Sequence, residues 1–224
     1  MNERIELTVN GEEVAVEAAE DETLLDVLRD DLGLLAAKDG CQPEGYCGAC
    51  TVLVDGSARV ACSTAASKFA GKSVVTLEGL TDHEREAFAL AFSATGASQC
   101  GFCSPGIVVK ARHLLTKNPQ PSRDEIAKAL AGNLCRCTGY VKVIDAIEMA
   151  GGILAGEEQP HLDWSGRLGS RTPKYQSFEL ALGLKPFIND MEVQDTSHGA
   201  LRFSDHPRAV VTKIDVSKAE AMDG

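Results

Sequence analysis

The sequence lacks several features that would place it in common functional classes. No stretch approaches the roughly 18 consecutive apolar residues of a membrane span, and the N-terminus, MNERIELTVNGEE, has neither a basic nor a hydrophobic segment. We therefore expect a cytoplasmic protein with no membrane partner. Basic runs are also missing, and the net charge is −11, with 33 acidic against 22 basic residues. This balance gives no support to a nucleic-acid partner.

Motifs for substrate chemistry are missing as well. No glycine-rich phosphate loop, Ser/His/Asp arrangement or carboxylate pair stands out, so no catalytic residue is assigned. The histidines stand apart from the cysteines, which disfavours a Rieske-type site, where two His replace two Cys. They are His83, His113, His161, His198 and His206. The chain alone is not expected to hold a substrate site.

Cysteine is the residue type that stands out. All eight cysteines lie between residues 41 and 137, and residues 138–224 contain none. In a cytoplasmic chain thiols stay reduced, so close cysteine spacings indicate metal or redox chemistry rather than disulfides.

The first set of cysteines resembles a ferredoxin loop. Its members are Cys41, Cys47, Cys50 and Cys62. Their spacing is the C-x4-C-x2-C…C pattern of plant-type ferredoxins with one more residue in the first gap. Gly45 and Gly48 let the backbone bring N–H donors close to cluster sulfurs. The spacing favours a [2Fe–2S] cluster, while a zinc site and unligated core thiols stay open as alternatives.

The second set of cysteines consists of two pairs at predicted helix starts. Its members are Cys100, Cys103, Cys135 and Cys137. Ser104-Pro105 follows the first pair and Thr138-Gly139 follows the second. An anionic cluster gains from the free N–H groups and the dipole at a helix N-terminus. The C-x-C pair is too tight for most zinc knuckles, so a second [2Fe–2S] cluster is favoured over zinc.

Residues 1–78 predict a small β-grasp domain. Alternating patterns flank Asn10-Gly11 in residues 4–17 and Asp55-Gly56 in residues 51–62, and each predicts a β-hairpin. An amphipathic helix over residues 22–33 and a closing strand at residues 73–77 complete this domain.

Residues 79–155 predict an all-α domain of short helices, which makes the fold class α+β. Thr81 and Ser122 each open a capping box, and Ser104-Pro105 supplies the cap and first helical position of another helix. A last helix is expected over residues 140–154.

Residues 156–224 are polar, with scattered glycines and prolines, and predict a linker that lies extended over a partner surface. Strand-like pieces occur at 200–203 and 209–214. Apolar side chains are too few for this segment to fold alone.

Three motifs carry a resemblance to a known family. They are GYCGACTVLVDG (45–56), QCGFCSPG (99–106) and GNLCRCTGY (132–140). With them, the chain resembles the iron–sulfur portion of the xanthine oxidase family of molybdenum hydroxylases. It departs from the family in the longer gap after Cys41, where Gln42-Pro43-Glu44 is expected to bulge into solvent.

The resemblance implies two [2Fe–2S] clusters with different neighbours. The first set of cysteines would hold an outer cluster, and the second set an inner cluster nearest the molybdopterin. Gln99 and Cys137 would contact the pterin. The implied partners are a molybdopterin-binding large subunit and an FAD-binding subunit, with electrons passing from molybdenum to the flavin or to an external acceptor.

The tail, SRTPKY…ALGLKPFINDM…HGALRFSDHPRAVVTKIDVSKAEAMDG, resembles the start of the molybdopterin-binding subunit of the same family. Molybdopterin would then belong to a partner chain or to a further C-terminal part.

The leading hypothesis is the electron-transfer component of a molybdenum hydroxylase that acts on a purine or related N-heterocycle. The alternatives are the same component in an aldehyde, carbon monoxide or aromatic acyl-CoA oxidoreductase, or a stand-alone ferredoxin-like carrier. The helical domain and the docking-like tail argue against a free carrier, which needs neither.

Overall fold

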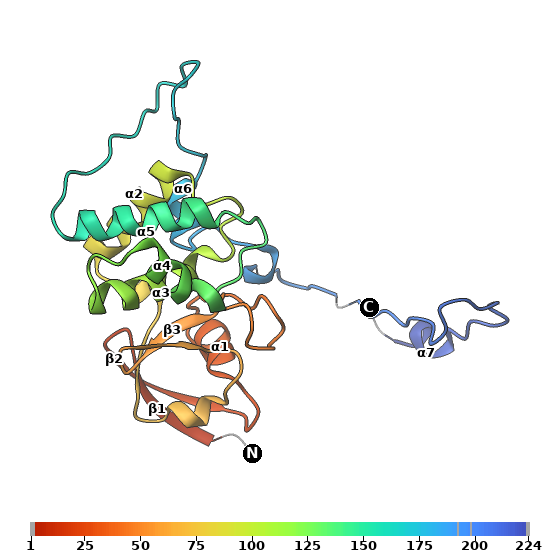
Figure 1. The fold of residues 1–224 in the computed structure, drawn as a ribbon. Helices are drawn as coiled ribbons and strands as arrows, with labels where there is room; N and C mark the ends of the chain where they lie inside the picture. The colour runs from red at the N-terminus through yellow and green to blue at the C-terminus, as the bar shows by residue number, and fades with distance from the viewer. Residues whose placement is uncertain (1–2, 192, 198, 223–224) are drawn as a thin grey trace. The chain divides into compact units, whose positions relative to one another are not determined.

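The computed structural model describes residues 3–191, 193–197 and 199–222. The chain forms two compact units, one ending at Pro186 and one beginning at Phe187. In the first unit a sheet is followed by a group of helices (Figure 1). The α+β prediction is confirmed.

The sheet has the strand order β2-β1-β5-β3-β4. Neighbouring strands are antiparallel except β1 and β5, which are parallel. The strands are β1 (Glu3–Val9), β2 (Glu12–Ala18), β3 (Thr51–Val54), β4 (Ser57–Val60) and β5 (Ser73–Val75). Both predicted hairpins are therefore present.

The turn chemistry explains both hairpins. Asn10, Gly11, Asp55 and Gly56 all have positive φ angles, as the tight turns between twisted antiparallel strands require. Asn10 also accepts a hydrogen bond from the Thr76 N–H at 2.9 Å, which ties the first turn to the chain after β5.

One short helical segment packs on the sheet. α1 (Leu24–Asp26) begins with a capping box from Thr23 and continues as the π-helical η1 (Val27–Asp31). Gly33, at φ 64°, ends the segment as predicted. Its buried side chains share one core with the inward face of the sheet, namely Leu24, Leu25, Val27, Leu28, Ile5, Leu7, Val52 and Val74.

The helical part forms a second core. Its helices are α2 (Asp82–Thr95), α3 (Ser104–Lys117), α4 (Arg123–Ala129) and α5 (Tyr140–Leu154), with the short turns η3 (Leu77–Gly79) and η4 (Leu130–Gly132). A further short turn, η2 (Ala66–Phe69), lies between β4 and β5 and belongs to the core of the sheet. Thr81 and Ser122 make the predicted capping boxes. Phe88, Phe92 and Ile147 are 0% exposed where α2 packs on α5.

The segment expected to be an extended linker contains one short helix that packs on the helical part. α6 (Ser177–Ala181) packs against α2 and α3, and Leu180 and Ala181 are buried there. Amphipathic spacing over so short a helix is a weak sequence signal, and only tertiary contact with the preceding helices stabilises it.

The second unit is described by itself. It contains η5 (Ile188–Asp190) and α7 (Ser217–Glu220). The strand-like pieces expected at 200–203 and 209–214 form no strand, because they have no partner strand in the described part of this unit. No helix in the described residues combines the length and the apolar character needed to cross a membrane.

Candidate metal centres

The sheet gathers the first set of cysteines. Cys41, Cys47 and Cys50 lie between η1 and β3, and Cys62 follows β4. Pairing of β3 with β4 brings Cys62 next to Cys50, and the Ala61 N–H donates to the Cys50 carbonyl at 3.2 Å. Cys50 and Cys62 are each 1% exposed, whereas the other two are partly exposed.

The thiols of this set are close enough to shift one another's pKa: Cys41 and Cys50 act on Cys47, and Cys50 and Cys41 act on Cys62. Among the described residues, no three ligand-type side chains surround one point as a single metal ion requires. Four neighbouring thiols, three from one loop and one from the end of a strand, fit a [2Fe–2S] cluster, which is held by four thiolates.

Backbone N–H groups surround the Cys41 sulfur. Burial opposes ionisation of this thiol, yet hydrogen bonds from the Cys47, Tyr46 and Gly45 backbones hold its pKa below the usual value. Gly45 has a φ of 73°, which lets the loop turn its N–H groups inward. Such donors also stabilise the sulfurs of an anionic cluster.

At Cys47 and Cys62 burial outweighs the backbone donors. It raises the pKa of Cys47, and it raises the pKa of Cys62 to about 12 with a further contribution from Cys50. A thiol at Cys62 therefore keeps its proton at neutral pH until a metal displaces it. Metal binding to this set is coupled to proton release.

Helix packing gathers the second set of cysteines. Cys100 and Cys103 lie between α2 and α3, and Cys135 and Cys137 lie between η4 and α5. Because α2 packs on α5, the two short loops meet. Cys103, rather than Ser104, occupies the N-cap of α3, which corrects the predicted helix start by one residue.

The thiols of the second set also influence one another: Cys137 and Cys135 act on Cys100, and Cys135 and Cys100 act on Cys103. Burial raises the pKa of both Cys100 and Cys103, while the Phe102 backbone N–H partly offsets the effect at Cys100. Each set thus gathers four neighbouring thiols.

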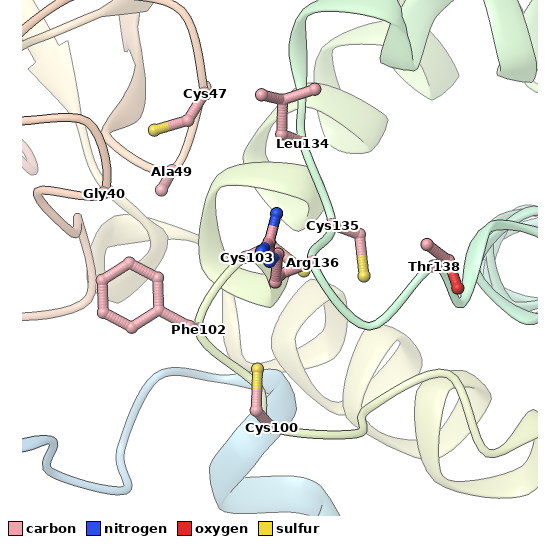
Figure 2. Close-up of a pocket in the computed structure, with 10 residues that line it drawn as sticks. All are labelled: Gly40, Cys47, Ala49, Cys100, Phe102, Cys103, Leu134, Cys135, Arg136 and Thr138. Carbon is pink, nitrogen blue, oxygen red and sulfur yellow. The ribbon is translucent and has the colours of Figure 1, made fainter.

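A cavity of about 460 Å³ lies between the two sets (Figure 2). Its wall combines Cys47 of the first set with Cys100, Cys103 and Cys135 of the second. The Phe102 ring projects toward the loop of the first set. The structure therefore brings the two predicted sites into adjacent positions.

Direct hydrogen bonds join the two ligand loops. The Leu134 N–H donates to the Cys47 carbonyl at 2.8 Å. One residue earlier, Asn133 Nδ2 donates to the Gly48 carbonyl at 3.0 Å. Successive residues of one loop thus bind successive carbonyls of the other.

Sequence reasoning missed two residues of this arrangement. Asn133 is 3% exposed, and the Tyr140 hydroxyl accepts from the Cys135 N–H at 2.8 Å. Both residues belong to the motif GNLCRCTGY, in which only the cysteines received a role. The motif indicated that this loop matters, but it does not indicate which residues of the first loop Asn133 binds.

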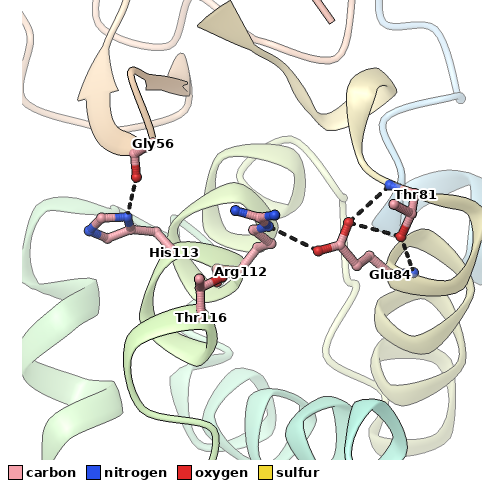
Figure 3. A network of polar contacts seen from close by, with 6 residues as sticks. All are labelled: Gly56, Thr81, Glu84, Arg112, His113 and Thr116. Atoms are coloured by element: carbon pink, nitrogen blue, oxygen red, sulfur yellow. Dashed lines mark hydrogen bonds and ion pairs between the residues drawn. The ribbon is translucent and has the colours of Figure 1, made fainter. Parts of the chain in front are cut away.

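Helix α3 supplies a further connection between sheet and helices (Figure 3). His113 Nδ1 lies 2.9 Å from the Gly56 carbonyl in the β3–β4 turn, and Arg112 Nε donates to Glu84 on α2 at 2.9 Å. His113 therefore has a structural contact remote from the cysteines. His198 lies outside the described residues.

Gln99 is exposed immediately before Cys100. A Cβ on Gly139 would lie 3.1 Å from Gln99 Nε2, so the amide rests against the loop that carries Cys137. The Gln99 carbonyl accepts a hydrogen bond from Lys174. Gln99 and Cys137 both lie beside Cys100, at one edge of the second set.

Two family models match this chain. A 2Fe-2S iron-sulfur cluster binding domain matches residues 7–73, and a [2Fe-2S] binding domain matches residues 76–148. Each match contains one complete set of four cysteines. Two [2Fe–2S] clusters therefore fit both the family matches and the two sets of four cysteines.

Relatives and solved structures agree with these matches. The nicotinate dehydrogenase small FeS subunit of Eubacterium barkeri is 43% identical over 147 residues, which are 65% of this chain and 93% of that protein. The aldehyde oxidoreductase of Megalodesulfovibrio gigas is 35% identical over 232 residues, covering 97% of this chain and 25% of that protein.

A crystal structure of the aldehyde oxidoreductase from Desulfovibrio desulfuricans superposes with a TM-score of 0.77 at 38% identity. The match covers 84% of this chain and 22% of that one, so the present chain spans about a quarter or less of the aldehyde oxidoreductases that it matches. The chain belongs to the [2Fe–2S] iron–sulfur subunits and segments of the xanthine oxidase family of molybdenum hydroxylases.

Proposed function

We propose that this chain passes electrons from a molybdopterin site, through two cysteine-bound [2Fe–2S] clusters, to a flavin subunit or an external acceptor. The observation that carries the proposal is the gathering of the eight cysteines in two sets of four, members of which line one cavity and lie in loops joined by the Leu134–Cys47 hydrogen bond. When bound, each [2Fe–2S] cluster supplies a one-electron redox couple.

The eight cysteines are the proposed ligands. Cys41, Cys47, Cys50 and Cys62 would hold the outer cluster in a β-grasp domain, residues 1–78. Cys100, Cys103, Cys135 and Cys137 would hold the inner cluster in a four-helix domain, residues 79–155. The strand order with β1 and β5 parallel at the centre of the sheet supports the β-grasp assignment.

The protein contributes ligands, N–H donors and exclusion of water. Cys50 and Cys62 are buried, and the Gly45, Tyr46 and Cys47 backbones donate toward the more exposed Cys41. Four thiolates make the centre anionic, so these donors offset the cost of holding that charge out of water.

Gln99 and Cys137 are the proposed contacts to the molybdopterin of a partner chain or further C-terminal part. A side-chain amide can both donate to and accept from the pterin ring, and a thiolate sulfur can accept from a pterin N–H. The exposure of Gln99, next to the loop that carries Cys137, supports this orientation.

The substrate class is proposed from the relatives. An N-heterocycle follows from the leading hypothesis and from the name of the nicotinate dehydrogenase subunit. The match over 97% of this chain to an aldehyde oxidoreductase supports an aldehyde as the second candidate. The match also supports a tail, 156–224, that leads into a molybdopterin-binding part.

Metal and cofactor analysis tests the proposal. The native complex that contains this chain should hold iron and acid-labile sulfide in equal amounts, together with molybdenum and pterin. Reduction should produce two distinct [2Fe–2S] signals in electron paramagnetic resonance. Zinc in place of iron would refute the cluster assignment, and clusters without molybdenum or pterin would favour the stand-alone carrier.

A variant tests the pterin contact separately. Gln99→Ala should leave both cluster signals and the molybdenum content intact while substrate reduces the inner cluster more slowly in a single turnover. Gln120→Ala, at an exposed position after α3, is the matched control and should leave that rate unchanged. An unaltered rate in Gln99→Ala would remove this residue from the route.

A further inference from the structure

We propose that Asn133 is a positioning residue that fixes the separation between the two cysteine sets, an inference that rests on the proposed two-cluster function. Asn133 belongs to neither set and touches no thiol in the contacts described below. Its role is to hold the loop of the second set against the loop of the first.

The side chain of Asn133 is the polar link across a buried contact. It is 3% exposed, and its Nδ2 lies 3.0 Å from the Gly48 carbonyl and 3.4 Å from Thr51 Oγ1. Thr51 Oγ1 also donates to the Gly48 carbonyl at 2.7 Å. A buried amide with such partners has one favoured placement, because moving it would leave an N–H group unsatisfied.

The backbone of Asn133 is held as firmly as its side chain. Its N–H donates to the Leu130 carbonyl at 2.8 Å, and its carbonyl accepts from the Tyr140 hydroxyl at 3.1 Å. The same hydroxyl accepts from the Cys135 N–H. Hydrogen bonds therefore run from a cysteine of the second set, through Tyr140 and Asn133, to the first loop.

Glycines make this close approach possible. A Cβ on Gly48 would lie 2.4 Å from the Gly132 carbonyl and 2.7 Å from Asn133 Nδ2. A Cβ on Gly106, on α3, would lie 2.3 Å from the Gly48 carbonyl. Since no side chain separates the loops here, their distance is set by the hydrogen bonds that cross the contact.

The consequence is a fixed path length for the electron. The Leu134 N–H follows Asn133 directly, so anchoring Asn133 at Gly48 also aligns Leu134 with the Cys47 carbonyl at 2.8 Å. Electron tunnelling falls steeply with distance, and a small opening of this contact would slow transfer between the clusters. Neither cluster would lose a ligand.

The test uses Asn133→Ala and Asn133→Asp in the full chain with both clusters assembled. Alanine removes the amide, and aspartate keeps its shape but places an acceptor against the Gly48 carbonyl. We expect unchanged iron and sulfide, slower electron transfer between the two clusters, and faster hydrogen–deuterium exchange at Leu134. Asn118→Ala is the matched control, because Asn118 contacts exposed Glu125 at 3.4 Å and lies remote from the loops.

The possible outcomes distinguish this inference from the proposed two-cluster function. If the rate of transfer between the clusters is unchanged in the Asn133 variants while both clusters remain, the inference is overturned and the two-cluster function stands. If the wild-type chain holds no iron, the proposed function itself fails. Should Asn133→Ala lose a cluster, Asn133→Ser provides the milder change. An unchanged transfer rate in that variant overturns the inference, and a slower rate supports it.

Discussion

The two cysteine sets each gather four neighbouring thiols, but they do so on different scaffolds. The first places three cysteines within ten residues of one loop, so local backbone conformation creates most of the site. The second joins loops separated by 31 residues, so the packing of α2 on α5 creates it. A site made by a loop depends on glycine and N–H placement, whereas a site made by packing depends on the core beneath it.

Removal of one ligand gives the largest expected effect on this comparison. Cys47→Ser should abolish the outer cluster and lower the iron content by about half, because each cluster has its own four thiolates. The inner-cluster signal should remain in electron paramagnetic resonance. The reciprocal variant, Cys100→Ser, should remove the inner signal alone. Joint loss of both signals in either variant would show that the two sets do not assemble independently.

A substitution in the helical core should have the next largest effect, and it should act on the inner cluster and not on the outer one. Phe92 is 0% exposed where α2 meets α5, and Phe92→Ala should lower the free energy of unfolding by ~3–5 kcal/mol. In Phe92→Ala the inner cluster should be lost at a lower temperature than in the unaltered chain, while the outer cluster persists. Visible absorption during heating measures both losses. Phe203→Ala, at a side chain 73% exposed, is the control and should change neither. Equal sensitivity of both clusters would contradict the comparison.

The contact between the scaffolds can be tested at Gly106. Alanine favours the helix by about 1 kcal/mol, but its Cβ would lie 2.3 Å from the Gly48 carbonyl. Steric overlap should win, so Gly106→Ala should destabilise the chain by about 1–3 kcal/mol in thermal melting. Gly132→Ala, where an added Cβ meets nothing within 4 Å, is the matched control. A stabilised Gly106→Ala variant would mean that the loops move apart freely.

A helix cap provides a smaller test within the second scaffold. Ser122 accepts from the Glu125 N–H at 3.3 Å at the start of α4. Ser122→Ala should lower stability by about 1 kcal/mol without altering either cluster spectrum. Ser165→Ala, in the exposed segment after α5, should have no measurable effect on the melting temperature. A changed inner-cluster spectrum would show that α4 shapes the site directly.

The pH dependence of one ion pair gives the smallest expected effect. Burial alone would raise the pKa of Glu84, but the Thr81 N–H and Arg112 hold it below the usual value (Figure 3). A lowered pKa stabilises the folded chain above the unfolded carboxyl pKa of about 4.3, and this contribution disappears as pH falls through the folded value.

Glu84→Gln should therefore cost about 0.5–1 kcal/mol at neutral pH and progressively less in acid. Glutamine preserves the capping box, so the change isolates the charge. Glu86→Gln, exposed on the same helix, is the control. A cost that stays constant down to pH 3 would assign the effect to packing instead of charge.

Much of the local structure was predictable because local chemistry determines it. Asn10-Gly11 and Asp55-Gly56 require positive φ, and both turns form where they were expected. The capping boxes at Thr81 and Ser122 satisfy helix N–H groups within one turn, so they too appear. The short helix α6 was missed, since its stability comes from contacts with α2 and α3.

The sequence by itself determined the cysteine spacing, the turn and cap residues, and hence the existence of two candidate [2Fe–2S] sites. Only the tertiary structure decided how those sites meet. The Leu134–Cys47 and Asn133–Gly48 hydrogen bonds join residues 85 or more positions apart. No local pattern encodes such a contact, because it exists only after the sheet and the helices have packed and the glycines have allowed the two backbones to touch.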